Sequence, residues 1–413
     1  MQTFTLIFII FLIASALTRL WLSYRQVKHI QSHRDQVPEA FAEKIPLEDH
    51  QKAADYSTVK LKFGRLGLIL EVVLLLLWTL GGGLNTLDIW WQGFALSPVW
   101  TGIAVILSLT ILMSLLDLPL SLYSTFVIEE RFGFNKMTAK IWAIDLFKSS
   151  LLMLVLGVPL IAVILWLMNQ AGDFWWLYAW SVWTAFSLFM IWAFPAFIAP
   201  LFNKFSALEE GSLKNRIESL LQRCGFTSQG VFIVDGSKRS AHGNAYFTGF
   251  GNNKRIVFYD TLLESLSEDE VEAVLAHELG HFKRNHIKKS LVLSIVMTLV
   301  GFATLAWLMN SDWFYSSLGI DNPSTHTALM LFMFIMPIFT FFITPLFSAM
   351  SRKHEFEADD FAKQQSDYRD LVSALVSMYR ENASTLTPDP IHSMFYDSHP
   401  PASIRINHLE TSS

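Results

Sequence analysis

Two histidines four residues apart, with a glutamate directly after the first, carry the clearest chemical signal in the sequence. The segment reads His277-Glu278-Leu279-Gly280-His281. Residues four apart lie one turn above each other on one helix face, so both imidazoles could bind one zinc ion at about 2.0–2.1 Å each. Glu278 would project about 100° around the helix from His277. It could therefore reach a water at the metal and act as general base without being a ligand.

This chemistry requires a helix, and the residues before the motif predict one. Ser267 followed by Glu270 is the pattern of a capping box that opens a helix. An apolar stripe that would anchor the helix follows at Val271, Val274 and Leu275. We expect the helix to run over 268–289. The alternative is a helix with two surface histidines, because so short a motif also occurs by chance.

A catalytic zinc site keeps three protein ligands and an open position for water, so a third ligand must come from elsewhere. The metzincin class would need glycine at 284 and histidine at 287. The sequence has Arg284 and Ile287 there, which excludes that class. A downstream glutamate on a second helix remains. Glu355 and Glu357 both qualify, His354 is a rival ligand, and the residues alone do not choose among them.

The composition indicates a protein partly surrounded by lipid. The chain has 413 residues, of which 52% are hydrophobic and only 16% are charged, whereas soluble domains have about 25% charged residues. The net charge of −5, without a basic footprint, argues against a nucleic-acid partner. Cys224 is the only cysteine, so no internal disulfide is possible.

Spanning helices need about 20 largely apolar residues, and the sequence offers seven such segments. They lie at 3–24, 65–86, 100–123, 148–168, 175–202, 290–309 and 327–349. Asp117 lies well inside the third segment. A charge at that depth usually lines a cavity or bonds to a partner, and both interpretations stay open.

The connecting loops alternate in charge. Loops rich in Lys and Arg follow the first, third, fifth and seventh segments, whereas the loops at 84–99, 169–174 and 310–326 have none. The positive-inside rule then places the N-terminus outside and both large polar stretches, 203–289 and 350–413, in the cytosol.

The first polar stretch is predicted to be an α/β unit. Its helical periodicity covers 212–224, and a short strand is expected at 231–234. Two further strands, at 245–250 and 255–259, would be joined by a turn at 251–254. His286, His326 and His392 have no partner at metal spacing and are expected to be structural.

Five stretches, taken together, resemble the integral-membrane zinc metalloproteases of the CAAX prenyl protease type I family. They lie at 122–136, 244–247, 277–281, 351–359 and 398–401. The family pattern on the second helix is a glutamate, two variable residues and then Ala-Asp. The resemblance implies Glu355 as the third zinc ligand, with Glu357 at a variable position. It also implies that Asp359 orients a ligand histidine or handles protons.

The same resemblance implies roles in substrate binding. His399 and Arg405 match positions expected to bind the substrate backbone and the developing oxyanion. The segment Asn244, Ala245 and Tyr246 resembles the edge strand on which such enzymes lay an extended peptide.

The fold that we expect is mainly α, with seven transmembrane helices around a chamber and a cytosolic α/β zinc-peptidase domain. Residues 1–205 would form a membrane domain with five spans, and residues 206–413 the peptidase domain with the other two.

The expected activity is peptide hydrolysis with one Zn²⁺ ion, on a peptide or protein substrate that the resemblance implies is lipidated. A broad membrane-protein quality-control protease is the first alternative, and a transporter or scaffold with an inactive site is the second. A bacterial inner membrane is favoured as the location, with the endoplasmic reticulum membrane as the alternative.

Overall fold

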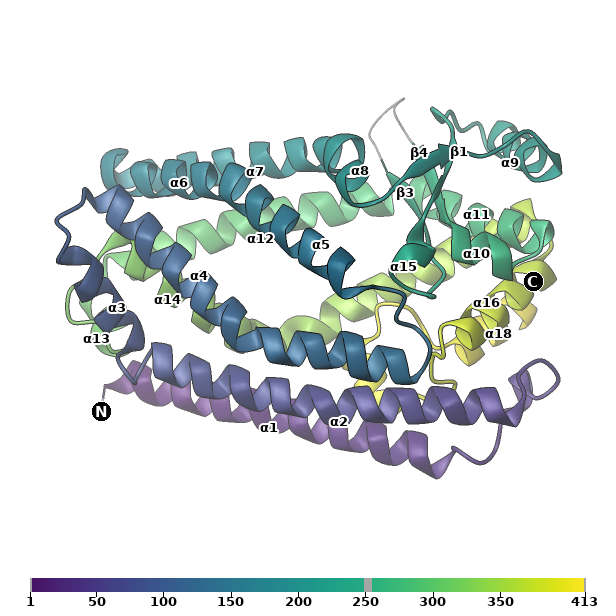
Figure 1. Ribbon diagram of the computed structural model, residues 1–413, viewed down its shortest axis with the longest axis horizontal. Coiled ribbons are helices and arrows are strands. Elements are labelled where there is room, and N and C mark those ends of the chain that lie inside the picture. Colours follow the sequence, from purple (N-terminus) through teal and green to yellow (C-terminus); the bar gives the residue numbers. More distant parts are fainter. Residues whose placement is uncertain (1, 249–254, 412–413) are drawn as a thin grey trace.

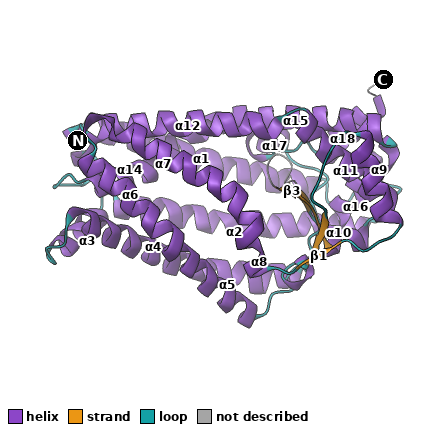
Figure 2. Ribbon diagram, turned by 90° about the horizontal axis from the view of Figure 1, so that it is seen from above, coloured by secondary structure: helices purple, strands orange, loops and turns teal. Residues whose placement is uncertain are grey.

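The chain folds into an elongated bundle of helices with a small sheet near one end. The computed structural model describes residues 2–248 and 255–411. Most long helices run along the long axis, and the two ends of the chain lie at opposite ends of the molecule (Figure 1). Seen from above, the sheet is confined to the end that also holds α9 to α11, α16 and α18 (Figure 2).

The helices have the following bounds, in chain order: α1 Thr3–Ser32, α2 Leu47–Trp78, α3 Gly83–Gln92, α4 Pro98–Tyr123, α5 Ala139–Leu152, α6 Val158–Gln170, α7 Trp175–Ala193, α8 Ala199–Phe202, α9 Ser212–Arg223, α10 Asp260–Ser265, α11 Glu268–Lys283, α12 His286–Met309, α13 Asp312–Ser316, α14 Thr325–Thr340, α15 Thr344–Gln365, α16 Tyr368–Glu381, α17 Pro390–Tyr396 and α18 Ala402–Thr411. Short π-helical segments continue α4, α5 and α7 without a loop.

The membrane-spanning prediction is confirmed, with longer helices than the sequence suggested. Among the described residues, six helical segments are long and apolar enough to cross a membrane, and the bent pair α2–α3 makes a seventh. The second span was expected to continue to residue 86, but α2 ends at Trp78 and the chain bends by 50° into α3. Large apolar side chains such as Phe147 and Leu346 are 69% and 68% exposed, as expected of surfaces that contact lipid.

Asp117 is exposed on α4 and makes no hydrogen bond or ion pair with any other described residue. Of the two roles considered for Asp117, the bond to a partner is therefore not formed among the described residues.

The sheet has four strands in the order β1-β2-β4-β3. They are β1 Phe205–Ala207, β2 Val231–Val234, β3 Ala245–Thr248 and β4 Arg255–Tyr259. The central pair β2–β4 is parallel and both outer pairings are antiparallel. The predicted strands are present, β3 is an edge strand as expected, and β1 was not predicted. The predicted turn 251–254 and residues 249–250 of the third strand lie outside the described residues.

The metal-motif helix ends earlier than predicted. We expected one helix over 268–289, but α11 ends at Lys283 and α12 begins at His286. Asn285, between them, has a φ of 58°. Asparagine is one of the few residues that adopt this left-handed conformation readily, which ends one helix and redirects the next. The sixth span therefore begins at His286 rather than at Ser290.

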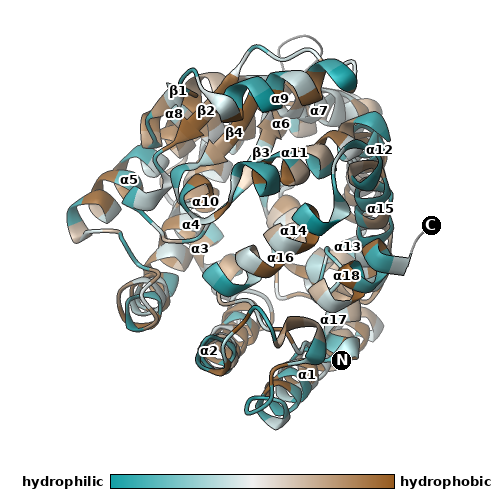
Figure 3. Cartoon of the chain, turned by 90° about the vertical axis from the view of Figure 1, so that its right-hand side faces the viewer, coloured by the Kyte–Doolittle hydropathy of each residue, from teal (hydrophilic) through white to brown (hydrophobic). Residues whose placement is uncertain are grey.

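The hydrophobic core around the sheet fixes the position of α11. Leu275 on α11 packs in one buried cluster with side chains from the sheet, α9, α15 and α16, including Leu220, Phe258, Phe361 and Leu375. Seen along the long axis, α11 lies close to the sheet, whose strands β2 and β4 are coloured as hydrophobic (Figure 3). Because the helix is held on several sides, its two histidines are fixed relative to α15.

Candidate metal centre

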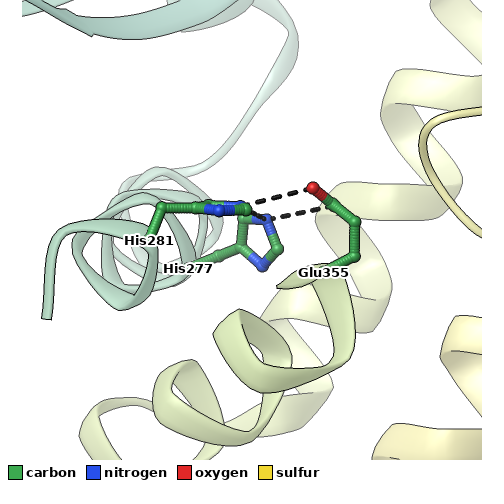
Figure 4. Close-up of side chains that lie close together, drawn as sticks. All are labelled: His277, His281 and Glu355. Atoms are coloured by element: carbon green, nitrogen blue, oxygen red, sulfur yellow. Dashed lines mark hydrogen bonds and ion pairs between the residues drawn. The ribbon is translucent and has the colours of Figure 1, made fainter. Parts of the chain in front are cut away.

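The three predicted ligands lie together where α11 faces α15. His277 and His281 project from α11, and Glu355 reaches them from α15 (Figure 4). The Nε2 atoms of the two histidines are 3.2 Å apart. Glu355 places Oε2 3.5 Å from Nε2 of His277 and Oε1 3.3 Å from Nε2 of His281. Within the described residues, this is the one group of three or more His, Cys, Asp or Glu side chains that could hold a metal ion.

These separations fit a tetrahedral metal. Ligands at about 2.0–2.1 Å from a tetrahedral zinc ion lie about 3.3 Å from one another. The two Nε2 atoms are 3.2 Å apart, and each lies close to a different oxygen of Glu355, at 3.5 Å for His277 and 3.3 Å for His281. Burial and Arg405 favour a neutral His277, but Asp359 and Glu355 outweigh them and raise the pKa of His277 to about 9. The surroundings therefore favour positive charge at the place where a metal would lie.

A small residue on each helix allows this close approach. A Cβ atom added at Gly280 would lie 2.9 Å from Cα and 3.0 Å from the carbonyl oxygen of Ala358. Both are backbone atoms, so they cannot move aside by a side-chain rotation. Gly280 lies between the two ligand histidines, and Ala358 one turn after Glu355. The contact of these two residues therefore sets the distance between the ligands.

Replacing Gly280 by Ala should force α11 and α15 apart. Overpacking of this kind costs about 1–3 kcal/mol, and it should also weaken metal binding because Glu355 moves away from the histidines. Thermal denaturation and metal content of the purified variant measure the two effects. Gly301→Ala is the matched control, since its nearest neighbour would be 3.9 Å away. Equal behaviour of the two variants would contradict this account.

Asp359 and Arg405 lie directly behind His277. Oδ1 of Asp359 is 2.8 Å from Nδ1 of His277, and the Asp359 side chain has no exposed surface. The guanidinium of Arg405 donates to both Asp359 oxygens, at 2.9 and 2.5 Å. Its NH2 group is also 3.2 Å from Nδ1 of His277. The three side chains form one buried cluster, and Nη1 of Arg405 is also 3.6 Å from Oε2 of Glu355.

Arg405 is buried beside two carboxylates of the site, Asp359 and Glu355. Its side chain is only 8% exposed, and its guanidinium is paired with Asp359. The contact with the substrate backbone and the developing oxyanion that the resemblance implied for Arg405 and His399 stays a prediction. The arrangement fits a role in holding Asp359, and through it His277.

Removing one partner of this buried pair should be costly. Arg405→Leu leaves the buried Asp359 carboxylate without its cationic partner and with His277 as its remaining contact, and the loss of a buried pair costs about 3–5 kcal/mol. Arg380→Leu is the control, because its pair with Glu381 is 40% and 45% exposed, and exposed pairs contribute about 1 kcal/mol or less. Thermal denaturation in detergent compares the two variants. If Arg405→Leu unfolds at a temperature as high as the control does, the buried-pair interpretation is contradicted.

His281 has its own neighbours, which the sequence did not indicate. Its Nδ1 atom is 3.1 Å from Nδ1 of His286, whose Nε2 atom is 3.0 Å from Oε2 of Glu357. The ring of His354 stacks on His286, with 4.1 Å between centroids and 11° between planes. His286 was expected to be merely structural, and His354 and Glu357 were rival ligands. All three lie behind His281 rather than at the ligand position.

Glu278 and His399 are the two other residues for which a catalytic role was predicted. Glu278 is half-buried and makes no hydrogen bond or ion pair with any other described residue. The His399 side chain is 64% exposed, and its Nδ1 atom is 2.7 Å from Oε2 of Glu355. His399 is therefore accessible beside Glu355, and Glu278 has no partner among the described residues that would occupy its carboxylate.

The predicted substrate segment lies beside the metal helix. Ala245 and Tyr246 are on β3, and Asn244 directly precedes it. Phe247 of β3 packs on Phe282 of α11, with 5.0 Å between ring centroids. β3 pairs only with β4 among the described strands. Its other edge is therefore not used by the sheet.

A bundle of membrane helices that brings a His-Glu-x-x-His helix against a facing glutamate defines a membrane-embedded metallopeptidase. A family model described as Peptidase family M48 matches residues 207–413, and one described as CAAX prenyl protease N-terminal, five membrane helices, matches residues 26–204. The chain belongs to peptidase family M48, in the group of the CAAX prenyl proteases.

Individual relatives agree with this assignment over almost the full length. The crystal structure of S. mikatae Ste24p matches with a TM-score of 0.91 and 33% identity, covering 99% of both chains. CAAX prenyl protease 1 of Saccharomyces cerevisiae is 34% identical over 419 residues, covering 94% of this chain and 91% of the yeast protein. The CAAX prenyl protease 1 homolog of Arabidopsis thaliana is 40% identical over 295 residues, covering 71% and 70% of the two chains.

Proposed function

We propose that this protein is a zinc endopeptidase that cleaves prenylated protein substrates within its membrane bundle. The observation that carries the proposal is the spacing of the donor atoms of His277, His281 and Glu355, which matches tetrahedral zinc. Zinc bound there would polarise the scissile carbonyl and make water a stronger acid.

The side chains around the ligands have distinct roles in this proposal. Glu278 takes the proton from the attacking water and passes it to the leaving amine. Its lack of other partners among the described residues supports this role. His399, which is exposed beside Glu355, binds the substrate or stabilises charge on its carbonyl oxygen. Asp359 fixes the ring orientation of His277, and Arg405 holds Asp359 in place.

The substrate is an extended peptide near a lipidated cysteine. The relatives are named for prenyl proteolysis, and CAAX denotes a C-terminal motif whose cysteine is prenylated. The open edge of β3, with Asn244, Ala245 and Tyr246, is the surface to which such a peptide would add as a further strand. Its packing against α11 supports a position next to the metal.

Cleavage assays of one peptide in two forms test the proposal. The purified protein should cleave a peptide with a farnesylated cysteine, and a zinc chelator should stop the reaction. The same peptide with an S-methyl cysteine should be cleaved with a higher KM. Equal cleavage of both forms, together with cleavage of unrelated membrane proteins, would favour the broad quality-control alternative. No cleavage by the zinc-loaded protein would refute the peptidase function.

The orientation and the division of the chain are part of the same proposal. The alternation of basic and uncharged loops supports an N-terminus outside and the peptidase unit in the cytosol. We also propose the boundary at residues 205 and 206. The matched relatives are eukaryotic, so the preference for a bacterial inner membrane gains no support, and the endoplasmic reticulum membrane is the better proposal. Labelling of single cysteines introduced into the loops would test the orientation.

A further inference from the structure

Two cavities lie end to end along the α1–α2 pair. The first has a volume of about 910 Å³ and reaches His399 beside the metal ligands. The second has a volume of about 490 Å³ and lies further along both helices, away from the peptidase unit. Arg19 and Tyr396 line both cavities. The second cavity therefore adjoins the first, which His399 also lines.

The second cavity is lined mainly by apolar side chains from α1, α2, α4 and α14. They include Leu12, Leu75, Trp78, Met113, Phe334 and Ile338. Its charged members neutralise each other, because Arg19 donates to both oxygens of Glu71 at 3.0 Å. The hydroxyls of Ser15 and Thr340 donate to carbonyls of their own helices. An occupant therefore needs no polar groups of its own.

We propose that this second cavity binds the isoprenoid chain of the substrate while the peptide lies at the metal. The inference rests on the proposed function and specifies where the lipid goes. A cavity of about 150 Å³ holds benzene, or about 25 Å³ per carbon. The fifteen carbons of a farnesyl chain would then need about 375 Å³, which the cavity of about 490 Å³ can hold. Methionine side chains such as Met113 and Met333 can adapt to a branched chain.

Ala16 provides a way to fill this cavity without touching the metal site, since it lines the second cavity but not the first. Ala16→Phe should raise the KM for the farnesylated peptide by about tenfold or more. The KM and kcat for the S-methyl peptide should stay within about twofold. Leu17→Phe is the control, because Leu17 is 60% exposed and lines neither cavity.

The possible results separate this inference from the peptidase function. An equal loss for both peptides, or an unchanged farnesyl preference, would overturn the cavity assignment and leave the peptidase function standing. If the unmodified enzyme cleaves the S-methyl and farnesylated peptides equally well, the cavity assignment is likewise overturned and the peptidase function stands. Loss of co-purifying phospholipid from Ala16→Phe, with the preference intact, would assign the cavity to a membrane lipid instead. Failure to cleave either peptide would overturn both.

A different observation carries a second inference, at the metal ligand His281. Its Nε2 atom faces Glu355 and His277, and when this atom binds the metal, the ring proton lies on Nδ1. That N–H donates to Nδ1 of His286 at 3.1 Å, and the Nε2–H of His286 then donates to Glu357 at 3.0 Å. The three groups have one consistent arrangement of protons in which both imidazoles are neutral, as metal binding requires.

We infer that His286 and Glu357 are positioning residues that fix the ring and tautomer of His281. The left-handed turn at Asn285 returns the chain so that His286, 3% exposed, lies against the ligand. His277 has a carboxylate directly behind it, in Asp359. For His281 the corresponding carboxylate is that of Glu357, which His286 connects to the ligand. Partners of this kind typically change metal affinity by about 10–100-fold.

Zinc affinity, measured by competition with a chelator on the full-length protein, tests this role. His286→Phe keeps the ring stack on His354 but removes both hydrogen bonds, so the affinity should fall by about 10–100-fold. His286→Gln can still accept from His281 and donate to Glu357, and should recover part of the loss. His354→Phe keeps the stack and touches no ligand, so its affinity should be unchanged. Wild-type affinity in His286→Phe, or equal losses in all three variants, would overturn the inference.

Discussion

Glu278→Gln should remove peptidase activity while leaving the bound metal in place. The carboxylate is the proposed general base, and positioned acid–base groups contribute about 10²–10⁴-fold to rate. The amide is nearly the same size but cannot accept the proton of water at neutral pH. Glu278 also lies outside the group of ligand atoms, so the substitution should not disturb coordination. Single-turnover cleavage rates and metal content on the same preparation measure the two effects.

A control on the same helix isolates the effect of the charge. Glu272 forms ion pairs with Arg216 and Arg223, away from the ligands. Glu272→Gln should keep both the metal and most of the activity. If Glu278→Gln cleaves at the wild-type rate, Glu278 is not the base. If it loses the metal, its effect on rate says nothing about proton transfer.

Local patterns in the sequence predicted the parts of the site that depend on one helix. The capping box at Ser267 forms as expected, with reciprocal bonds to Glu270. The four-residue spacing then places His277 and His281 on one face. Both results follow from helix geometry alone and need no information about neighbouring elements. The spanning segments were predictable for the same reason, because apolar length is a local property.

The parts that were missed depend on contacts between elements. One backbone conformation at Asn285 decides whether α11 continues or turns, and helical periodicity carries no sign of it. His286 has no partner at metal spacing along the chain, yet the turn brings it to 3.1 Å from His281. Gly280 matters because α15 approaches closely, which only the packed structure shows. The importance of these residues comes from tertiary packing rather than from their sequence pattern.

Arg405 shows what a family resemblance predicts about a residue and what it does not. The resemblance located it correctly at the site, since it contacts Asp359 and lies 3.2 Å from His277. It did not predict the direction of the side chain. The buried carboxylate of Asp359 requires a partner, and Arg405 supplies it. Burial and pairing therefore decide the role of this cation, and both depend on the folded structure.

Glu355→Ala should abolish metal binding, whereas Glu357→Ala should retain it with reduced affinity. Glu355 is only 3% exposed, and its two oxygens are 3.5 and 3.3 Å from the two ligand nitrogens. Its loss removes the only carboxylate of the ligand group and leaves two imidazoles. Glu357 contacts His286 and not the ligand position. Its removal should weaken affinity by about 10–100-fold, which still allows full occupancy at micromolar zinc when the wild-type affinity is high.

Metal content after dialysis, followed by chelator competition, distinguishes the two carboxylates. His354→Ala belongs in the same series, because His354 was the third candidate ligand and stacks on His286 instead. It should keep its metal. A metal-free Glu357→Ala beside a metal-loaded Glu355→Ala would reverse the assignment of the ligand. Equal, modest losses in both would mean that neither carboxylate binds the metal directly, and that the spacing of the three donor atoms does not reflect coordination.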